Sequence, residues 1–359
     1  MIDRHQTELV RTIADAGSLS AAATLLHLTP SAVSHRLRKL EETLDLQLFE
    51  RSVGGLRITP AGEALYAHDR HLQDRSQQVE RRLAELRDHA AYRYTHGYST
   101  AEANRLLDQA STVADFIHHD SCWPAGATVL EVGCGIGAQT KIIARQNPDC
   151  RFIGVDLSEA SIAQARADPD FQGLPNVEFR VGDVYRLPEL EITFAHVLVC
   201  FVLEHLRRPA EVLTLLHAAL PPGGTLTAIE GDHGSAYFHP ESTYADRAVA
   251  AQVALQHRNG GNANIGRQLH PLLTAAGFAR PTITPRCIYV DDHSPGLKEN
   301  FVLRTFTPMI AGIRDAAVAA QIETAAVLDR GLADLRRTSG VGGTFSYTFY
   351  KGVAVRQLV

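Results

Sequence analysis

Hydrophobic and polar residues follow two different patterns along the chain, and the pattern changes near residue 92. Before that point, apolar residues recur every three or four positions, which is typical of amphipathic helices. After it, short apolar runs of strand length alternate with helical segments, which is typical of an α/β domain. The first part predicts helices over residues 8–16, 19–28 and 32–41, and then short strands over residues 46–51 and 56–59.

A long polar helix is expected over residues 61–91. Leu65, Leu72, Val79 and Leu86 recur every seven residues, and Leu83 fills a neighbouring row. A heptad stripe on a charged helix is typical of a coiled-coil seam. The alternative is that the stripe packs on the rest of its own chain.

The second part predicts a doubly wound parallel sheet. Its first two apolar runs, residues 129–132 and 152–155, are hydrophobic on both faces, as strands of a covered sheet require. A helix over residues 100–119 should precede the first strand, and residues 138–146 should form the first crossover helix. Two long segments, before and after the sixth strand, are typical of functional lids. The expected strands cover residues 128–132, 151–155, 177–181, 194–199, 225–229, 282–290 and 344–355.

Length and composition place the chain among globular proteins. At 359 residues it exceeds one ordinary domain, so two are expected. Its hydrophobic content of 45% and its net charge of -5 argue against wholesale coating of nucleic acid. The five cysteines form no C-x-x-C pair, so we expect reduced thiols and no metal site. With no apolar run of membrane-spanning length and no signal peptide, the sequence predicts a cytoplasmic protein that does not bind membranes.

A glycine-rich turn is the strongest candidate for a ligand site. The run T-V-L-E-V-G-C-G-I-G over residues 128–137 ends a strand in three alternating glycines, which allow the backbone to approach a ligand closely. Asp156 follows Gly137 by nineteen residues, at the distance where such folds offer a carboxylate to ribose hydroxyls. The glycines also satisfy a dinucleotide fingerprint, so an NAD site and an empty turn both remain open at this point.

Further residues narrow the choice of ligand. Glu131 precedes the glycines by two, where an acid suits an amino-acid ammonium and repels a pyrophosphate. Asp183 follows the third strand and can accept a hydrogen bond from an adenine amino group. Together with C-F-V-L-E-H-L (200–206) and L-P-P-G-G-T-L (220–226), these motifs resemble the class I S-adenosylmethionine (SAM)-dependent methyltransferases over residues 92–359.

The resemblance implies a Rossmann-like seven-stranded fold with helical lid insertions, SAM as cofactor and a small-molecule acceptor. A segment before the first strand would close over the cofactor, with Tyr98, Arg105 and Gln109 either contacting its aminocarboxylate or merely packing. The implied cofactor contacts are Glu131, Gly133, Cys134, Gly135, Gly137, Asp156, Leu157, Ser158, Asp183, Val184, Cys200, Phe201, Tyr98 and Gln109.

The helix expected over residues 32–41 has a buried stripe and a basic, hydrogen-bonding surface, as the recognition helix of a helix-turn-helix requires. L-T-P-S-A-V-S-H-R-L-R-K-L-E and L-F-E-R resemble the DNA-binding domain of LysR-type regulators, which dimerise through a linker helix. Residues 1–90 hold 12 Lys and Arg against 13 Asp and Glu, a net charge of -1. DNA affinity must therefore come from a local basic face, chiefly Arg36, Arg38, Lys39, Arg51 and Arg57. The alternative is a module kept only for packing or dimerisation. The implied DNA contacts are Ser31, Ser34, His35, Arg36, Arg38, Lys39 and Arg51.

Two polar residues after the fifth strand are candidates for catalysis. Methyl transfer needs positioning, and also proton removal where the acceptor is O–H or N–H. His233 is the candidate general base and Glu230 is a candidate to orient the acceptor. The alternative is that the stretch 230–235 is a loop that caps a helix and orders the lid. The aromatic and apolar residues Phe301, Phe306, Met309 and Tyr347 are candidates for an acceptor pocket, with plain core as the stronger interpretation.

The sequence therefore predicts an N-terminal winged helix-turn-helix (1–60), a linker helix (61–91) and a class I methyltransferase (92–359). LysR regulators continue into a two-lobed effector domain, and this chain departs from that pattern completely. We expect a methyltransferase that forms a homodimer and binds double-stranded DNA. The alternative is a transcriptional regulator whose methyltransferase fold only senses SAM or a metabolite.

Overall fold

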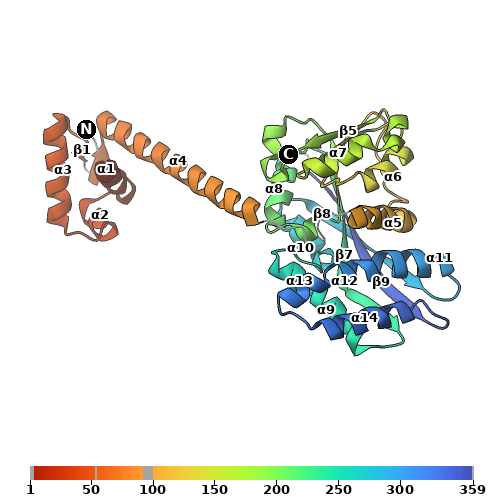
Figure 1. The fold of residues 1–359 in the computed structure, drawn as a ribbon. Helices are drawn as coiled ribbons and strands as arrows, with labels where there is room; N and C mark the ends of the chain where they lie inside the picture. Colours follow the sequence, from red (N-terminus) through yellow and green to blue (C-terminus); the bar gives the residue numbers. More distant parts are fainter. Residues whose placement is uncertain (1–3, 53–54, 92–99, 358–359) are drawn as a thin grey trace. The chain divides into compact units, whose positions relative to one another are not determined.

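The computed structural model describes residues 4–52, 55–91 and 100–357 (Figure 1). The chain divides into two compact units, residues 1–92 and 93–359. Each unit has hydrophobic clusters of its own.

The first unit is a helix-turn-helix followed by a two-stranded wing. Ser18 and Thr29 accept hydrogen bonds from backbone amides at the starts of the second and third helices, and a proline occupies the first turn of the third. Val33, Leu37 and Leu40 of that third helix are buried in the core of the unit. The elements are α1 (Arg4–Ala16), α2 (Leu19–Leu25), α3 (Pro30–Leu44) and the antiparallel pair β1 (Phe49–Ser52) and β2 (Gly55–Ile58), as the sequence predicted.

A single helix, α4 (Pro60–Ala91), follows the wing, where one long helix was expected over residues 61–91. Its beginning is tied to α1, because the buried carboxylate of Asp69 accepts hydrogen bonds from Thr7 and Arg11, both at 2.8 Å. Farther along, Leu72 is 41% exposed and Val79 is 58% exposed. The heptad stripe is therefore open to solvent at these two positions in the single chain.

The second unit is built on a seven-stranded sheet of order β5-β4-β3-β6-β7-β9-β8. The first five strands in this order are parallel, and β9 is antiparallel to both of its neighbours. All seven strands were anticipated, with small shifts at their ends except in β7. They are β3 (Thr128–Val132), β4 (Arg151–Asp156), β5 (Val177–Val181), β6 (His196–Cys200), β7 (Thr225–His239), β8 (Ala279–Val290) and β9 (Thr344–Val355).

Helices cover both faces of this sheet, so alternate residues of each central strand enter different cores. Val129 packs in the cluster that includes α5 and α6, whereas Leu130 packs in the cluster that includes α8 and α10. The crossover elements are α5 (Thr100–Ile117), α6 (Ala138–Gln146), α7 (Glu159–Ala167), η1 (Pro169–Gly173), η2 (Val184–Leu190), η3 (Leu203–His205), α8 (Pro209–Ala219), η4 (Ile265–Gln268) and α10 (Leu269–Ala275).

The two long segments form helices that gather beside the extended ends of β7, β8 and β9 (Figure 1). Four aromatic rings from these elements, Phe238, Phe301, Phe306 and Phe345, pack against one another there. The segments contain α9 (Thr243–Arg258), α11 (Pro295–Leu297), the π-helix η5 (Lys298–Phe306), α12 (Thr307–Gly312), α13 (Arg314–Ala319) and α14 (Ala325–Arg337).

One strand end was predicted wrongly. We expected the fifth strand of the sheet to stop at Ile229, but β7 continues to His239. Residues 230–235 therefore lie within a strand and not in a loop. β9 supplies a long antiparallel partner for this extension, with an irregularity between Asp232 and Tyr237, and the period of β7 alone did not reveal that pairing.

Candidate functional site

The glycine turn joins β3 to α6 at the carboxyl edge of the sheet. Gly133, Gly135 and Gly137 have φ of +68°, +54° and +80°, which disfavours any other residue. A Cβ on Gly133 would lie 2.5 Å from a Val202 methyl, and one on Gly137 would lie 2.7 Å from the Phe171 ring. A Cβ on Gly135 would meet nothing within 4 Å. The middle glycine thus faces open space, as close approach of a ligand requires, whereas the other two are also needed for packing.

Asp156 ends β4 next to this turn. Its carboxylate accepts the backbone N–H of Gly135 and that of Ser158, both at 2.8 Å. Burial raises the pKa of Asp156, and the two amide hydrogen bonds oppose that shift. Leu157 beside it is 38% exposed, and Ser158 accepts a hydrogen bond from a backbone amide in the first turn of α7. The acid predicted for ribose recognition is therefore held in place by the glycine turn.

Glu131, the acid before the glycines, is enclosed and only 2% exposed. The hydroxyl of Thr140 on α6 donates to its Oε2 at 2.5 Å. Burial raises the pKa of Glu131 to about 7; the Thr140 hydrogen bond opposes this shift and the nearby Asp156 adds to it. A carboxyl in this state suits a cationic partner, because a nearby positive charge favours the ionised form.

The other predicted cofactor contacts line the same edge of the sheet. Asp183 accepts the backbone N–H of Tyr185 at 2.9 Å, and Val184 begins η2 directly after it. Cys134 and Cys200 are buried, and burial raises the pKa of both thiols well above its ordinary value. The raised pKa values argue against a nucleophilic role for either thiol.

Phe201 follows β6 with a φ of +58°, an uncommon conformation for a non-glycine residue that often marks a functional loop. Gln109 of α5 accepts a hydrogen bond from Arg105 at 2.7 Å. Arg105 also makes a bidentate ion pair with Glu102 at 2.7 and 2.6 Å, so its guanidinium is committed within α5. Tyr98 lies outside the described residues.

Glu230 is fully buried and holds the loop after β6. Its Oε1 accepts the backbone N–H groups of Val202 and Leu203 at 3.0 and 2.8 Å, whereas Oε2 has no hydrogen-bond partner. Burial and the neighbouring Glu204 raise the pKa of Glu230 well above its ordinary value. This carboxyl therefore fixes the loop that carries Phe201, and it is closed to solvent.

His233 lies near Glu230 on β7 and is 5% exposed. Its Nδ1 is 3.4 Å from the hydroxyl of Tyr347, and its Nε2 is 3.5 Å from Oε2 of Glu204. Both ring nitrogens therefore face protein groups. Gly231 makes room for this contact, because a Cβ there would lie 2.4 Å from the Tyr347 hydroxyl.

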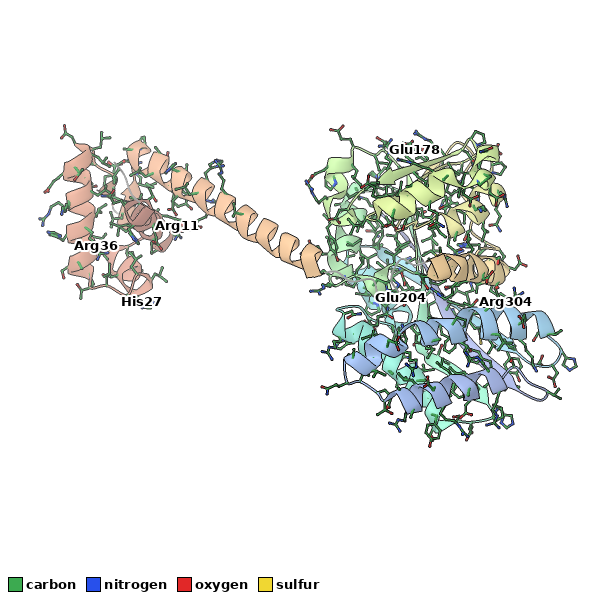
Figure 2. All side chains as sticks on the ribbon, in the orientation of Figure 1. Arg11, His27, Arg36, Glu178, Glu204 and Arg304 are labelled. Carbon is green, nitrogen blue, oxygen red and sulfur yellow. The ribbon has the colours of Figure 1, made fainter. Side chains whose placement is uncertain are left out.

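The sequence analysis missed Glu204, which brings two histidines together. Its Oε1 is 3.6 Å from Nε2 of His205, and Gln256 donates to its Oε2 at 3.1 Å. Figure 2 places Glu204 inside the second unit. Its position within L-E-H-L was visible in the sequence, but its contact with His233 depends on the meeting of β6 and β7.

Asp232 is not available for chemistry, because Arg267 of η4 forms a bidentate ion pair with it at 2.8 and 2.6 Å.

The candidate pocket residues Phe301, Phe306, Met309 and Tyr347 are all buried in one hydrophobic cluster. The interpretation as core is therefore confirmed for Phe301, Phe306 and Met309, whereas the hydroxyl of Tyr347 reaches His233.

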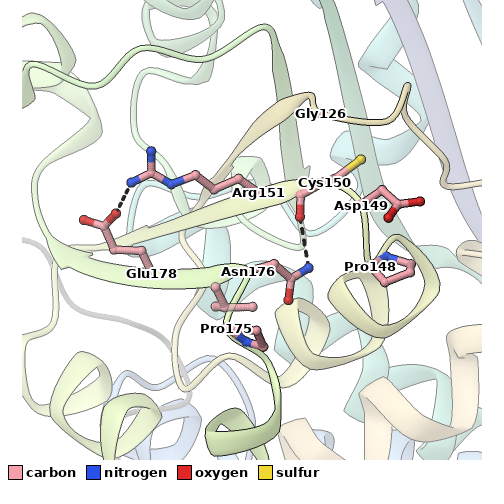
Figure 3. A pocket seen from close by; sticks show the side chains of 9 residues that line it. Gly126, Pro148, Asp149, Cys150, Arg151, Pro175, Asn176 and Glu178 are labelled. Atoms are coloured by element: carbon pink, nitrogen blue, oxygen red, sulfur yellow. Dashed lines mark hydrogen bonds and ion pairs between the residues drawn. The ribbon is translucent and has the colours of Figure 1, made fainter.

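A separate open hollow of about 410 Å³ lies at the amino ends of β4 and β5 (Figure 3). Arg151 and Glu178 form an ion pair at 2.6 Å on its wall, and Asn176 donates to the carbonyl of Cys150 at 3.0 Å. The glycine turn and Asp156 lie at the carboxyl ends of the strands, the opposite edge of the sheet. This hollow is therefore not the predicted cofactor site.

In the first unit, six of the predicted DNA contacts share one surface. Val33, Leu37 and Leu40 face inward from α3, and Figure 2 shows Arg36 pointing away from the helix bundle. Arg57 is paired with Glu50 across the wing at 2.9 Å, and the side chain of Arg51 lies outside the described part of the chain. The exposed residues on α3 are Ser31, Ser34, His35, Arg36, Arg38 and Lys39.

Among residues 4–52, 55–91 and 100–357, no helix is long and apolar enough to cross a bilayer. Within the same ranges, no cluster of three or more His, Cys, Asp or Glu side chains is arranged to hold a metal ion.

Comparison with known proteins gives a match in each unit. A family of methyltransferase domains matches residues 129–224, which supports SAM as the cofactor. A protein of transposon TN4556 from Streptomyces fradiae is 31% identical over 230 residues, covering 64% of this chain and 63% of that protein. Trans-aconitate 2-methyltransferase of Variovorax paradoxus is 30% identical, covering 47% of this chain and 60% of that protein. The chain thus spans less than two thirds of the length of these relatives.

Among solved structures, phosphoethanolamine N-methyltransferase 2 of Haemonchus contortus is similar with a TM-score of 0.43 and 16% identity, covering 70% of this chain and 53% of that chain. The [4+2]-cyclase SpnF is similar with a TM-score of 0.42 and 21% identity, covering 72% of this chain and 82% of that chain. The bacterial regulatory helix-turn-helix family of the LysR type matches residues 5–63. The chain therefore joins a helix-turn-helix domain of the LysR family to a methyltransferase domain.

Proposed function

We propose that the second unit transfers a methyl group from SAM to a small-molecule acceptor, and that the first unit binds double-stranded DNA as part of a homodimer. The observation that carries the first half is the glycine turn with Asp156 fixed beside it. The open space at Gly135 suits a ligand in contact with the backbone. Asp156 suits ribose hydroxyls, and Glu131 suits the ammonium of the methionine part.

When bound, SAM supplies a methyl group on a sulfonium for in-line displacement, so positioning is the protein's main contribution. Where the acceptor carries O–H or N–H, His233 is our candidate base. Because both of its nitrogens face protein groups, we assign the path through Tyr347: its oxygen takes the acceptor's proton while its own hydroxyl proton moves to Nδ1. Glu230 orients this region by holding the loop after β6.

The test is label transfer from SAM that carries a deuterated methyl group. The full-length protein is incubated with this SAM and a metabolite extract, and products are identified by mass spectrometry. A product with CD3 in place of H supports the enzyme and reveals the acceptor, whereas the absence of label at saturating SAM refutes turnover on the compounds present.

Removal of the ribose acid provides a binding test. Asp156→Ala should weaken SAM binding about tenfold or more, since hydrogen bonds to charged groups contribute about 1.5–3 kcal/mol. Asp149→Ala, at the opposite edge of the sheet, is the matched control and should bind SAM normally. Equal affinities for the two variants in calorimetry would rule out this site for SAM.

A second candidate function is SAM or metabolite sensing without turnover. It is favoured by the closed surroundings of Glu230 and His233, which are 0% and 5% exposed. Tight SAM binding and DNA retention without any labelled product would select this reading. A labelled product would reject it.

The proposed dimer rests on the exposed apolar positions of α4. Leu72 and Val79 lie seven residues apart on the stripe and are both open to solvent. Leu72→Glu/Val79→Glu should convert a dimer to a monomer in light scattering. The substitution Arg75→Glu, also exposed on α4, is a control for added negative charge. A wild-type monomer at micromolar concentration would contradict the proposal.

A further inference from the structure

We propose that Glu204 is a positioning residue: its one buried carboxylate holds both His205 and His233 with a proton on Nε2 and stabilises a proton that either ring accepts on Nδ1. What the two rings do with such a proton rests on the proposed function. The arrangement of the three side chains does not depend on the proposed function, because the interatomic distances alone define it.

The first step is the placement of the carboxylate between the rings. Oε1 is 3.6 Å from Nε2 of His205 and Oε2 is 3.5 Å from Nε2 of His233. The His233 distance is at the outer limit of a hydrogen bond, and the His205 distance is that of an ion pair. The three side chains come from η3 and β7, and each is almost closed to solvent, with 12% exposure at most.

The second step is the tautomer. An ionised carboxylate only accepts hydrogen bonds, so a neutral ring that faces it places its proton on Nε2. Nδ1 is then an acceptor, and the groups that face it can donate. Tyr347 lies 3.4 Å from Nδ1 of His233, and Nε2 of Gln256 lies 3.5 Å from Nδ1 of His205. For His233 both sides therefore give the same assignment. For His205 the carboxylate alone gives it, because the two N–H groups of Gln256 point to the carbonyl and Oε2 of Glu204 at 3.0 and 3.1 Å.

The third step is the charge of Glu204. Burial opposes ionisation, but the two imidazoles and the Gln256 amide hold the pKa of Glu204 below its usual range. Burial lowers the pKa of His205, and Glu204 opposes that shift. The pKa of the adjacent Glu230 shifts in the opposite direction, because burial and Glu204 raise it. Of the two neighbouring carboxyl groups, Glu204 is therefore ionised and Glu230 is protonated.

The charged and titratable groups around Glu204 come from several elements. Glu230 and His233 lie on β7, Gln256 on α9 and Tyr347 on β9. On α5, Arg105 lowers the pKa of His205 and its ion-pair partner Glu102 raises it. Glu204 is therefore the ionised group that both rings share.

The experiment is ¹⁵N NMR of the imidazole nitrogens in the full chain, with signals assigned through His205→Gln and His233→Gln. In the wild type we expect both rings as the Nε2–H tautomer when neutral. Glu204→Gln should lower the pKa of His205 by about one unit or more, because an opposite charge within about 4–6 Å is lost. His217 is the internal control, and Glu211→Gln, an exposed acid near the same turn, is the matched variant.

A folded Glu204→Gln protein in which His205 keeps the wild-type pKa overturns the inference. If that variant does not fold, Tyr347→Phe tests the same assignment from the other side of His233. Loss of the donor to Nδ1 should leave the proton of the neutral His233 ring on Nε2. A switch to the Nδ1–H tautomer in Tyr347→Phe would show that Glu204 does not fix the ring.

Label transfer separates this inference from the proposed function. In the assay with deuterated SAM, Glu204→Gln should move the acidic limb of the rate profile to lower pH, whereas a general structural defect lowers the rate equally at every pH. Shifted ring pKa values without any labelled product in the wild type would support the arrangement and reject turnover. A labelled product together with an unmoved limb and unmoved rings would reject the role of Glu204 alone.

Discussion

Replacement of Glu131 by glutamine should stabilise the second unit in a pH-dependent way. In the folded protein the pKa of this carboxyl is about 7, against an ordinary value of 4.5. Below pH 4.5 the group is protonated in both the folded and the unfolded state, and it then costs no stability. Between pH 4.5 and pH 7 the unfolded chain ionises this carboxyl while the folded protein keeps it protonated, so wild-type stability falls over this interval and levels off above pH 7.

The size of the effect follows from the interval between the two pKa values. At 1.36 kcal/mol per pH unit, the full cost above pH 7 is about 3 kcal/mol. At pH 5 about 1 kcal/mol of it is already present, so Glu131→Gln should gain about 2.5 kcal/mol more over the wild type at pH 8 than at pH 5. Burial of this side chain at 2% exposure means that solvent screening does not reduce the figure much.

The assay is urea unfolding followed by tryptophan fluorescence. Trp123 is the single tryptophan of the chain and contacts Phe152 of β4 edge to face, at 5.8 Å between ring centroids, so its signal reports the second unit. Glu241→Gln, an exposed acid in the same unit, is the control and should show no such dependence. A gain for Glu131→Gln that is equal at pH 5 and pH 8 would refute the reasoning.

The same carboxyl links pH to the proposed cofactor. If the ionised form binds the ammonium of SAM, apparent affinity scales with the ionised fraction of Glu131. That fraction rises about tenfold between pH 6 and pH 8 for a pKa of about 7. Calorimetry should therefore show wild-type SAM affinity increasing with pH over this range, whereas Glu131→Gln should bind weakly and with little pH dependence.

Other substitutions test the turn and the DNA-binding face. Gly133→Ala should destabilise the second unit by about 2–4 kcal/mol, from positive φ and a clash with Val202, and a combined Val202→Ala should restore part of that loss; no restoration would show that the clash is not the cause. Arg36→Ala/Arg38→Ala should weaken binding to a mixed-sequence duplex pool and reduce the salt slope by about two, as measured by fluorescence anisotropy. Arg70→Ala, exposed on α4, is the matched control, and an unchanged slope in the double variant would remove α3 from the interface.

The sequence by itself determined the elements whose signal is local. Capping residues and proline define the starts of α2 and α3, and uninterrupted apolar runs define β3, β4 and β6. The glycine turn and Asp156 were found because spacing along the chain sets the distance between consecutive strands of a parallel sheet. Interactions within a turn or between adjacent strands are readable from one stretch of chain.

Only the tertiary structure decided the extension of β7 and the surroundings of His233. A strand gains residues when a partner strand runs alongside, and the partner here, β9, lies more than a hundred residues away along the chain. The same pairing places Tyr347 on one side of the ring, and the loop after β6 places Glu204 on the other. Burial, which sets the protonation of Glu131, Glu204 and Glu230, depends on all the layers packed around them, so no local pattern could have assigned it.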